Sequence, residues 1–433
     1  MSLRNVKGTR DLLPPETAIW QAVEDVVRRV FALYGYHEIR TPLLEDTELF
    51  VRGVGEGTDI VGKEMYTFED RKGRSLTLRP ENTAAVARAY LQHRLQDQPP
   101  PVKLFYVGPQ FRYERPQRGR YRQFHQIGAE LIGDEGPGSD AELLLMLVRF
   151  LRELEFESLT VRLNSVGDAA SRSRFAAALR EVLLPQRDAL GEDSRRRLDS
   201  NPLRILDTKV AAERELLVGA PRLADFLGED DRRHFSRLLE LLDRWRVPYE
   251  VDDGLVRGLD YYPRTVFEIA SQDLGAQDAI LGGGRYDGLT RDLGGPEVPG
   301  IGFAIGQDRL VEVLPESFRQ RCAGAPPVVV VPVGEHHQET CLALGERLRD
   351  AGVVALVELS GRSVKAALKA ADRQQARFVV LLGDDEAAQS TVTVRDFARG
   401  EQAPVAQDRL AGWLRERLDR VEGDPSSTVA AGR

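Results

Sequence analysis

The chain has 433 residues, of which 42% are hydrophobic and 30% are charged. This length predicts about two to four domains, and the composition is that of a globular protein that buries sizeable cores, which excludes a fibrous or fully disordered chain. A formal net charge of −8 argues against a protein that coats nucleic acid without specificity, but it does not exclude a local basic groove.

Cysteine content and hydropathy restrict where the chain functions. Two cysteines occur, Cys322 and Cys341, and they cannot form a disulfide framework or a zinc cluster on their own. The N-terminal segment lacks a continuous apolar run, and no stretch approaches the roughly 18 apolar residues that span a bilayer. We therefore expect a cytoplasmic protein without a membrane partner.

The N-terminal third predicts one helix and several strands. Apolar residues at helical spacing predict an amphipathic helix over 16–33. The extended run 37–45 contains Pro42, and because proline has no N–H to donate, this strand should lie at a sheet edge or against another chain. Aromatic and β-branched residues predict further strands over 75–80, 103–114 and 123–133. The last two form a hairpin with an arginine-rich loop.

The middle of the chain combines sheet and helix. A helix over 139–154 precedes a strand over 158–166, and charged amphipathic helices then dominate residues 168–246. Strand patterns resume at 249–252, 265–271, 281–289 and 300–306. Because the strands on both sides of the helical stretch need one common core, we expect that stretch to be an insertion into a single sheet domain.

The C-terminal part predicts a separate module. Residues 322–327 form a candidate linker. Beyond it, strands and helices alternate at 328–333, 337–350, 353–359, 364–373 and 378–382. This order is typical of a small, mostly parallel α/β module, although its first turn lacks the glycine fingerprint of a dinucleotide site. The small, polar residues 423–433 predict a disordered tail.

Two arginine-bearing segments carry the first chemical signals. The hairpin loop concentrates five arginines: Arg112, Arg115, Arg118, Arg120 and Arg122. Guanidinium groups suit a polyphosphate or a nucleic-acid end, whereas a solvated charged loop is the simpler explanation for an isolated cluster. In the second segment a glycine-rich strand runs into a helix that begins near Arg309, and tight packing without a ligand would also explain that pattern.

Together with the helix and strand around Pro42, these segments resemble the three ordered motifs of class II aminoacyl-tRNA synthetases. Further stretches resemble bacterial histidyl-tRNA synthetases over roughly residues 4 to 415: KGTRDLLPPE, LTLRPENTA, RYERPQRGRYRQFHQIGAELIG, NPLRILDTK, LVRGLDYYPRTVFE and LGGGRYDGL. RGLDYY is the most specific of them. The resemblance implies an α+β catalytic domain with an antiparallel sheet (the class II synthetase fold), a helical insertion and a C-terminal α/β anticodon-binding domain. Their expected bounds are 1–167 with 247–321, 168–246, and 327–422.

The resemblance also implies a histidine–tRNA ligase, which activates L-histidine with ATP to histidyl-adenylate and transfers histidine to the 3′-terminal adenosine of tRNA(His). Activation is an in-line attack of a carboxylate on the α-phosphate, so the site mainly positions reactants and neutralises charge. By resemblance, Arg112 and Arg257 hold the α-phosphate and Arg309 holds the γ-phosphate. Glu114 and Arg120 complete the ATP site. The family also implies Mg²⁺, a hard ion that prefers oxygen ligands.

A histidine pocket is assigned by the same resemblance. Its residues are Glu81 and Thr83 for the α-amino group, Gln126 for the amino and carboxylate groups, Glu130 and Tyr262 for the imidazole edge, and Tyr261 and Tyr286 for the wall. Taken alone, each would more simply be a surface carboxylate or a core aromatic. A polar pocket of this type rejects isosteres strongly, so no editing domain is needed.

Contacts with RNA and with a second subunit are implied as well. The resemblance assigns Arg115 and Gln117 to the acceptor end of the tRNA. It assigns Arg362 and Lys365 to the anticodon side, where a solvated helix face is an equally simple explanation. A homodimer is expected from the family and from the proline-bearing strand.

Two positions depart from the family's pattern. Asn82 stands where a glycine is common, which puts the loop beside the substrate amine in doubt. Asp308 precedes Arg309 where a glutamate is usual, which puts metal or adenine positioning in doubt. None of the histidines is assigned to a metal, since His336 and His337 lie at a loop-to-helix junction without partner cysteines.

Two other classes of protein remain open. A non-catalytic, synthetase-like regulatory subunit of ATP phosphoribosyltransferase would keep a histidine pocket as a sensor. Proteins of that class typically lack the anticodon-binding domain and have lost the catalytic arginines. This chain has both a C-terminal module and the arginines. A pure RNA-binding module on the same scaffold would not need a complete amino-acid pocket. Histidine-dependent exchange of pyrophosphate into ATP separates an enzyme from both alternatives.

Overall fold

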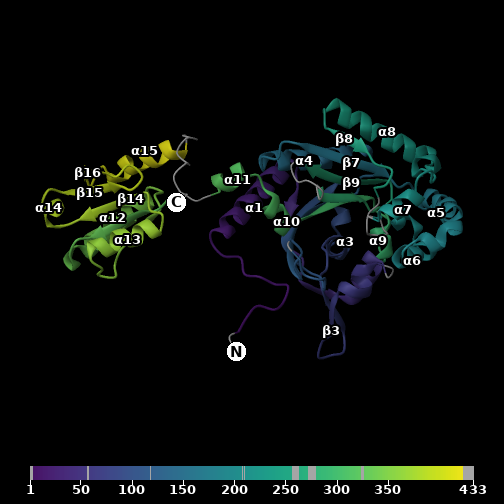
Figure 1. Cartoon of the computed structure of the whole chain (residues 1–433), viewed down its shortest axis with the longest axis horizontal. Coiled ribbons are helices and arrows are strands. Elements are labelled where there is room, and N and C mark those ends of the chain that lie inside the picture. Colours follow the sequence, from purple (N-terminus) through teal and green to yellow (C-terminus); the bar gives the residue numbers. More distant parts are fainter. Residues whose placement is uncertain are drawn as a thin grey trace. The chain divides into compact units, whose positions relative to one another are not determined.

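The computed structural model describes residues 3–422 except 56–57, 118, 207, 209, 256–262, 272–278 and 323–325. The chain divides into two compact units, Met1–Cys322 and Ala323–Arg433 (Figure 1). Among the described helices, none is long and apolar enough to cross a membrane. The predicted disordered tail lies outside the described residues.

The first unit is built on an eight-stranded, mainly antiparallel sheet (Figure 1). Its order is β1-β5-β6-β11-β10-β9-β7-β8, in which β1 is parallel to β5 and β7 is parallel to β8. The strands are β1 (His37–Glu38), β5 (Val102–Phe111), β6 (Gln123–Ile132), β7 (Leu159–Ser165), β8 (Tyr249–Val251), β9 (Thr265–Ser271), β10 (Ala279–Arg285) and β11 (Gly300–Gly306). Strands from both sides of the helical stretch therefore share one sheet, and the predicted antiparallel fold is confirmed.

One face of this sheet is apolar, because side chains alternate across each strand. Phe105, Ile127 and Phe303 lie on this face and belong to the largest core cluster. The Phe31 ring packs edge-on against Phe105 and Phe303, at centroid distances of 5.6 and 5.9 Å. The helices that cover the face are α1 (Glu16–Leu33), α4 (Pro137–Glu153), α8 (Glu229–Arg244), α10 (Gln307–Val313) and α11 (Glu316–Arg321).

A smaller layer lies on the other side of the sheet. It contains α2 (Thr47–Val54), α3 (Thr83–Gln92), α9 (Leu289–Asp292) and a three-stranded sheet of β2 (Leu44–Asp46), β4 (Ser75–Leu78) and β3 (Tyr66–Glu69). The prediction of one continuous strand over 37–45 is wrong. Residues 39–43, around Pro42, lie in no strand, so β1 ends at the edge of the large sheet and β2 belongs to the small one. The edge position is as predicted, whereas β3 was not predicted.

The helical stretch packs onto the sheet through its own apolar cluster. This stretch contains α8 and three further α-helices: α5 (Ala169–Leu183), α6 (Glu192–Ser200) and α7 (Ala211–Leu216). Phe175 and Leu179 join Val266 of β9 in this cluster. Asp231 of α8 accepts hydrogen bonds from Arg264 Nε at 3.0 Å and from the Asp168 amide at 2.9 Å. The stretch is thus tied to the sheet by both apolar and polar contacts.

The second unit has a five-stranded sheet of order β13-β12-β14-β15-β16. Its strands are β12 (Val328–Pro332), β13 (Ala355–Val357), β14 (Phe378–Leu382), β15 (Thr391–Asp396) and β16 (Glu401–Ala406). One face carries α12 (Gln338–Asp350) and α15 (Leu410–Glu422), the other carries α13 (Val364–Arg373), and α14 (Asp384–Ala388) follows β14. The first three strands are parallel as predicted, but β15 and β16 form an antiparallel pair that was not predicted, so the module is mixed α/β.

Candidate active site

The face of the large sheet opposite the apolar core is rich in glycine. There β6 presents Gln126, Gly128 and Glu130. Their partners on the neighbouring strand β11 are Gly306, Ala304 and Gly302. On the other side, β5 places Gly108 opposite Gln126 and Tyr106 opposite Gly128. Because directly opposed residues share a face, the polar side chains of β6 stand among glycines.

Glu130 is the central carboxyl of this face and is fully buried. Its side chain lies directly on Gly302, where an added Cβ would overlap the Glu130 carboxylate. The Thr83 hydroxyl donates to Glu130 Oε1 at 2.8 Å. Burial raises the pKa of Glu130 to about 8, although the hydroxyl groups of Tyr286, Thr83 and Tyr106 act in the opposite direction. This carboxyl can therefore change protonation state close to neutral pH.

Glu81 holds the start of α3 beside this carboxyl. Its two oxygens accept the amides of Thr83 at 2.7 Å and Ala84 at 3.0 Å. Burial raises the pKa of Glu81, and these amides act against that shift. The adjacent Asn82 has φ −117°, so no glycine is required there, and its side chain accepts a hydrogen bond from the Thr41 hydroxyl at 2.8 Å. The departure at Asn82 thus ties the loop to the segment around Thr41.

Two buried glutamines offer polar atoms to a ligand. Gln126 Oε1 and both amide atoms of Gln110 have no hydrogen-bond partner among the described residues. A buried polar atom without a partner costs roughly 1–3 kcal/mol, so a bound ligand or water would relieve this cost. Gln110 was missed in the sequence. Its alternation with Gly108 and Tyr106 along one strand is the signal that could have revealed it.

The arginine loop follows β5 and bends back toward the buried carboxyls. Arg112 Nε donates to the Pro80 carbonyl at 2.8 Å, which fixes its guanidinium beside the segment that carries Glu81. Glu114 lies between two arginines, 3.9 Å from Arg112 and 3.8 Å from Arg120. The loop therefore presents guanidinium groups, the donors that suit phosphate oxygens, with a carboxylate between them.

The tip of this loop contacts the start of α10. Gly119 has φ +70°, a conformation that favours glycine. An added Cβ there would lie 3.9 Å from Arg309 Cβ and 3.1 Å from Glu312 Oε2. Arg309 is half-buried in the first turn of α10. The structure thus brings the predicted Arg309 next to the loop that carries Arg120.

Asp308 anchors α10 to β6 and to the N-terminal segment. Its oxygens accept the His125 amide at 2.7 Å and the Arg10 guanidinium at 3.1 Å. Although burial alone would raise the pKa of Asp308, these contacts hold it below its usual value. Asp308, which departs from the family's pattern, therefore connects α10 to β6 and to the N-terminal segment through hydrogen bonds.

The remaining predicted residues fall into two groups. Four predicted RNA contacts are exposed: Arg115, Gln117, Arg362 and Lys365. Three predicted site residues lie outside the described part of the chain: Arg257, Tyr261 and Tyr262.

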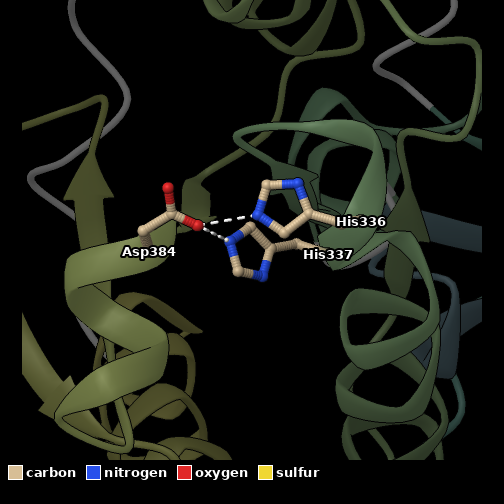
Figure 2. Close-up of side chains that lie close together, drawn as sticks. All are labelled: His336, His337 and Asp384. Atoms are coloured by element: carbon tan, nitrogen blue, oxygen red, sulfur yellow. Dashed lines mark hydrogen bonds and ion pairs between the residues drawn. The ribbon is translucent and has the colours of Figure 1, made fainter.

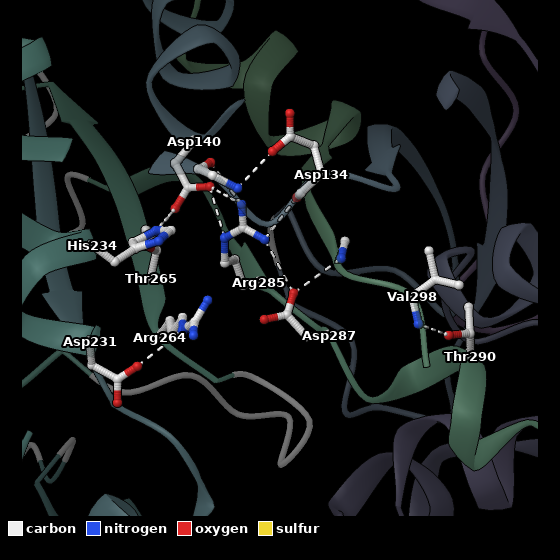
Figure 3. A network of polar contacts seen from close by, with 12 residues as sticks. Asp134, Asp140, Asp231, His234, Arg264, Thr265, Arg285, Asp287, Thr290 and Val298 are labelled. Atoms are coloured by element: carbon white, nitrogen blue, oxygen red, sulfur yellow. Dashed lines mark hydrogen bonds and ion pairs between the residues drawn. The ribbon is translucent and has the colours of Figure 1, made fainter. Parts of the chain in front are cut away.

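A buried polar network supports β10, the strand that ends directly before Tyr286 (Figure 3). Arg285 is fully buried, and its Nε and a terminal nitrogen lie 2.9 and 2.7 Å from Asp140 Oδ1. Although burial raises the pKa of Asp140, Arg285 holds it below its usual value. Asp140 Oδ2 contacts two further side chains, His234 and Thr265. The network joins α4, α8, β9 and β10 next to the residue that precedes Tyr286.

Comparison with known proteins assigns the chain to a family. Residues 8–310 match the family described as Histidyl-tRNA synthetase, and residues 327–417 match the Anticodon binding domain. The histidine–tRNA ligase of Koribacter versatilis (strain Ellin345) is 47% identical, over 97% of this chain and 98% of its own length. The chain belongs to the histidyl-tRNA synthetase family. The predicted family and fold class are confirmed.

Solved structures of histidyl-tRNA synthetases agree with this assignment. The apo enzyme of S. aureus has a TM-score of 0.79 at 35% identity, covering 95% of this chain and 99% of that one. A Bacillus halodurans structure, described as an ATP phosphoribosyltransferase regulatory subunit/histidyl-tRNA synthetase, has a TM-score of 0.66 at 24% identity over 88% of this chain and 99% of that one. At that identity it shows the shared fold alone.

Proposed function

We propose that this chain is a cytoplasmic histidine–tRNA ligase, which forms histidyl-adenylate from L-histidine and ATP and then esterifies histidine to the 3′-terminal adenosine of tRNA(His). The supporting observation is a pair of buried carboxyls, Glu81 and Glu130, that are linked through Thr83. Arg112 lies close enough to act against the burial that raises the pKa of Glu81. A polar pocket and a phosphate-binding loop are therefore neighbours, as attack of a carboxylate on an α-phosphate requires.

In this proposal the pocket recognises both ends of histidine. The residues are Glu81 and Thr83 at the ammonium group, Gln126 between the ammonium and carboxylate groups, Glu130 with Tyr262 at the imidazole, and Tyr261 with Tyr286 as the wall. Glu130 is fully buried, and the Thr83 hydroxyl holds one of its oxygens in place, so a ligand without a ring N–H would lose the contact with this carboxyl. Such a site rejects isosteres by larger factors than an apolar pocket does.

Arginines bind and orient ATP in the proposed site. Arg112 and Arg257 take the α-phosphate and Arg309 takes the γ-phosphate, while Arg120 and Glu114 complete the loop. Mg²⁺, when bound, would neutralise phosphate oxygens, and two carboxylates, Glu114 in this loop and Glu312 beside it, offer the oxygen donors it prefers. The loop positions the phosphates for in-line attack by the histidine carboxylate.

The first half-reaction is tested by histidine-dependent exchange of pyrophosphate into ATP. Arg112→Ala should lower the exchange rate on the order of a hundredfold or more, with little change in histidine affinity, because Arg112 acts on developing phosphate charge. The matched control is Arg71→Ala, an exposed arginine in the turn between β3 and β4, which should leave exchange unchanged. Equal losses in rate and histidine affinity would contradict the role of Arg112.

Absence of exchange in the unaltered chain would overturn the enzymatic proposal. Histidine binding without exchange would favour a sensor, such as the regulatory subunit of ATP phosphoribosyltransferase. Binding of tRNA without histidine would favour a pure RNA-binding module. Retention of Arg112, Arg309 and a complete second unit supports the enzyme over both.

We also propose the domain limits, the RNA contacts and a homodimer. The catalytic domain comprises 1–167 and 247–321, the insertion 168–246 and the anticodon-binding domain 327–422. Arg115 and Gln117 contact the acceptor end, and Arg362 and Lys365 contact the anticodon side. Their substitution should impair aminoacylation while leaving pyrophosphate exchange intact. The short β1 at the sheet edge supports a subunit contact, which light scattering tests.

A further inference from the structure

Two adjacent histidines and a distant aspartate meet in the second unit. His336 and His337 follow β12, and Asp384 follows β14 as the first residue of α14. Strands β12 and β14 are neighbouring and parallel, with Pro332 opposite Leu382. Their carboxyl ends therefore lie at the same edge of the sheet, the usual position of ligand sites in parallel α/β sheets.

The three side chains converge on one oxygen atom (Figure 2). The Nε2 atoms of His336 and His337 lie 2.7 and 2.9 Å from Asp384 Oδ1. The two imidazole rings are 4.0 Å apart between centroids. The ligand atoms of the trio all lie within 4.8 Å of one another. Two aromatic nitrogens and a carboxylate oxygen therefore face one small volume.

Solvent reaches this volume from one side. The His337 side chain is 9% exposed, whereas those of His336 and Asp384 are 65% and 80% exposed. A buried ligand fixes the position of the trio, and two exposed ligands can adjust to an ion. The open side leaves room for water molecules to complete a coordination shell.

The donor set selects the kind of ion. Imidazole nitrogens with one carboxylate suit Zn²⁺ and its neighbours in the transition series, whereas Mg²⁺ and Ca²⁺ prefer oxygen alone. With zinc–ligand bonds of about 2.0–2.2 Å, neighbouring donor atoms in a tetrahedral site are roughly 3.3 Å apart. The two separations between nitrogen and Asp384 Oδ1, 2.7 and 2.9 Å, need to widen by only about half an ångström, and the exposed Asp384 side chain is free of tight packing that would oppose this. The ion would replace the protons that now join the nitrogens to the carboxylate.

We propose that His336 Nε2, His337 Nε2 and Asp384 Oδ1 bind a divalent cation of the zinc class, with water in the remaining positions. The ion would connect the segment after β12 to the segment after β14. The sequence pattern assigned no metal to these histidines because they have no partner cysteines, and Asp384, which lies 47 residues beyond His337, is not visible as a neighbour in the sequence. This site is independent of the proposed histidine–tRNA ligase activity.

Calorimetric titration of ZnCl₂ into the chelator-treated full chain, without a polyhistidine tag, tests the proposal. We expect one site of micromolar affinity at near-neutral pH and no heat with Mg²⁺. His336→Ala and Asp384→Asn should each weaken binding on the order of tenfold to a hundredfold, because a ligand is lost. Both residues are exposed, so the fold should survive. The matched control is His93→Ala, an exposed histidine of the first unit, which should leave binding unchanged.

Electron paramagnetic resonance with Cu²⁺ identifies the ligands directly. The unaltered chain should show coupling to two imidazole nitrogens, and His336→Ala should show coupling to one. If the titration with Zn²⁺ gives no heat of binding, the trio is a hydrogen-bonded contact and not a metal site. The proposal is also wrong if Zn²⁺ binds His336→Ala as tightly as the His93→Ala control.

Discussion

At the scale of the single residue, Glu130 links protonation to stability. It is fully buried, and burial raises its pKa to about 8. The folded state thus holds the Glu130 proton more tightly than the unfolded state, in which a glutamate has its usual pKa of about 4.3. The neutral carboxyl contributes fully to stability below the unfolded pKa. This contribution is lost as the pH rises through the folded value.

Glu130→Gln should remove this pH dependence. Between about pH 5 and about pH 8, the free energy of unfolding of the unaltered chain should fall relative to that of the variant by up to ~4 kcal/mol. The variant keeps the shape of the side chain and cannot ionise. Urea denaturation at several pH values measures the difference. A constant difference across this range would show that Glu130 keeps an ordinary pKa.

Two glycines of β11 provide a second test of single residues. Gly302→Ala should destabilise the first unit by ~1–3 kcal/mol, since its Cβ would overlap the Glu130 carboxylate and lie 2.7 Å from the Ala129 carbonyl. Gly306→Ala, on the same face, meets nothing within 4 Å and should change stability by less than ~0.5 kcal/mol. If both substitutions lower the free energy of unfolding equally in urea denaturation, the change in strand propensity, and not steric overlap with Glu130, causes the loss.

At the scale of elements, the Arg285–Asp140 pair holds several segments together. Arg285 of β10 contacts Asp140 of α4, and Asp140 in turn contacts α8 and β9 through His234 and Thr265. Both members of the pair are fully buried. Removal of one partner leaves the other charge buried with only its secondary contacts, which for Arg285 include Asp287 at 3.2 Å, and this costs more than removal of both.

A double-mutant cycle tests this coupling. Arg285→Met and Asp140→Asn should each destabilise the first unit by ~3–5 kcal/mol, because each removes one charge of the closest buried pair while the other charge stays buried. The double variant should lose clearly less than the sum, with a coupling of at least ~1 kcal/mol by urea denaturation. Additive losses would show that the two groups act independently.

The elements found in the sequence are those with a strong local signal. The helix over Glu16–Leu33 was predicted with its observed bounds because its apolar spacing is regular. The run around Pro42 was wrongly predicted as one strand. Its composition is typical of strands, but composition cannot reveal that its two ends belong to two different sheets. The pair β15 and β16 was missed although β15 alternates regularly, because β16 alternates less clearly and contains Pro404.

The candidate site depended on a resemblance more than on pattern. Glu81, Thr83 and Glu130 were named from family motifs, and the structure brings them together across strands and a helix. Gln110 and Asp384 were not named. The surroundings of Gln110 depend on the register between β5 and β6, and those of Asp384 depend on the neighbouring ends of β12 and β14. Neither relation is visible in a single run of residues.

At the scale of the whole molecule, each compact unit has its own apolar core. The largest core cluster belongs to the unit Met1–Cys322, and two smaller clusters fill the faces of the five-stranded sheet. Units with separate cores can unfold in separate cooperative steps. Their stabilities then respond to different substitutions.

Calorimetry should resolve two unfolding transitions in the full chain. Leu147→Ala in α4 and Leu382→Ala in β14 each remove a fully buried side chain, at a cost of ~2–5 kcal/mol. Each variant should lower the midpoint of one transition and leave the other in place. A single transition shifted by both variants would show that the units unfold together.

A separate core in each unit also bears on how such chains diversify. Because each unit on either side of the boundary between Cys322 and Ala323 has its own apolar core, exchange of the second unit for that of a relative leaves the core of the first unit complete. Chimaeras joined at this boundary should therefore fold, and RNA preference can change across generations while the chemistry of the first unit is inherited intact.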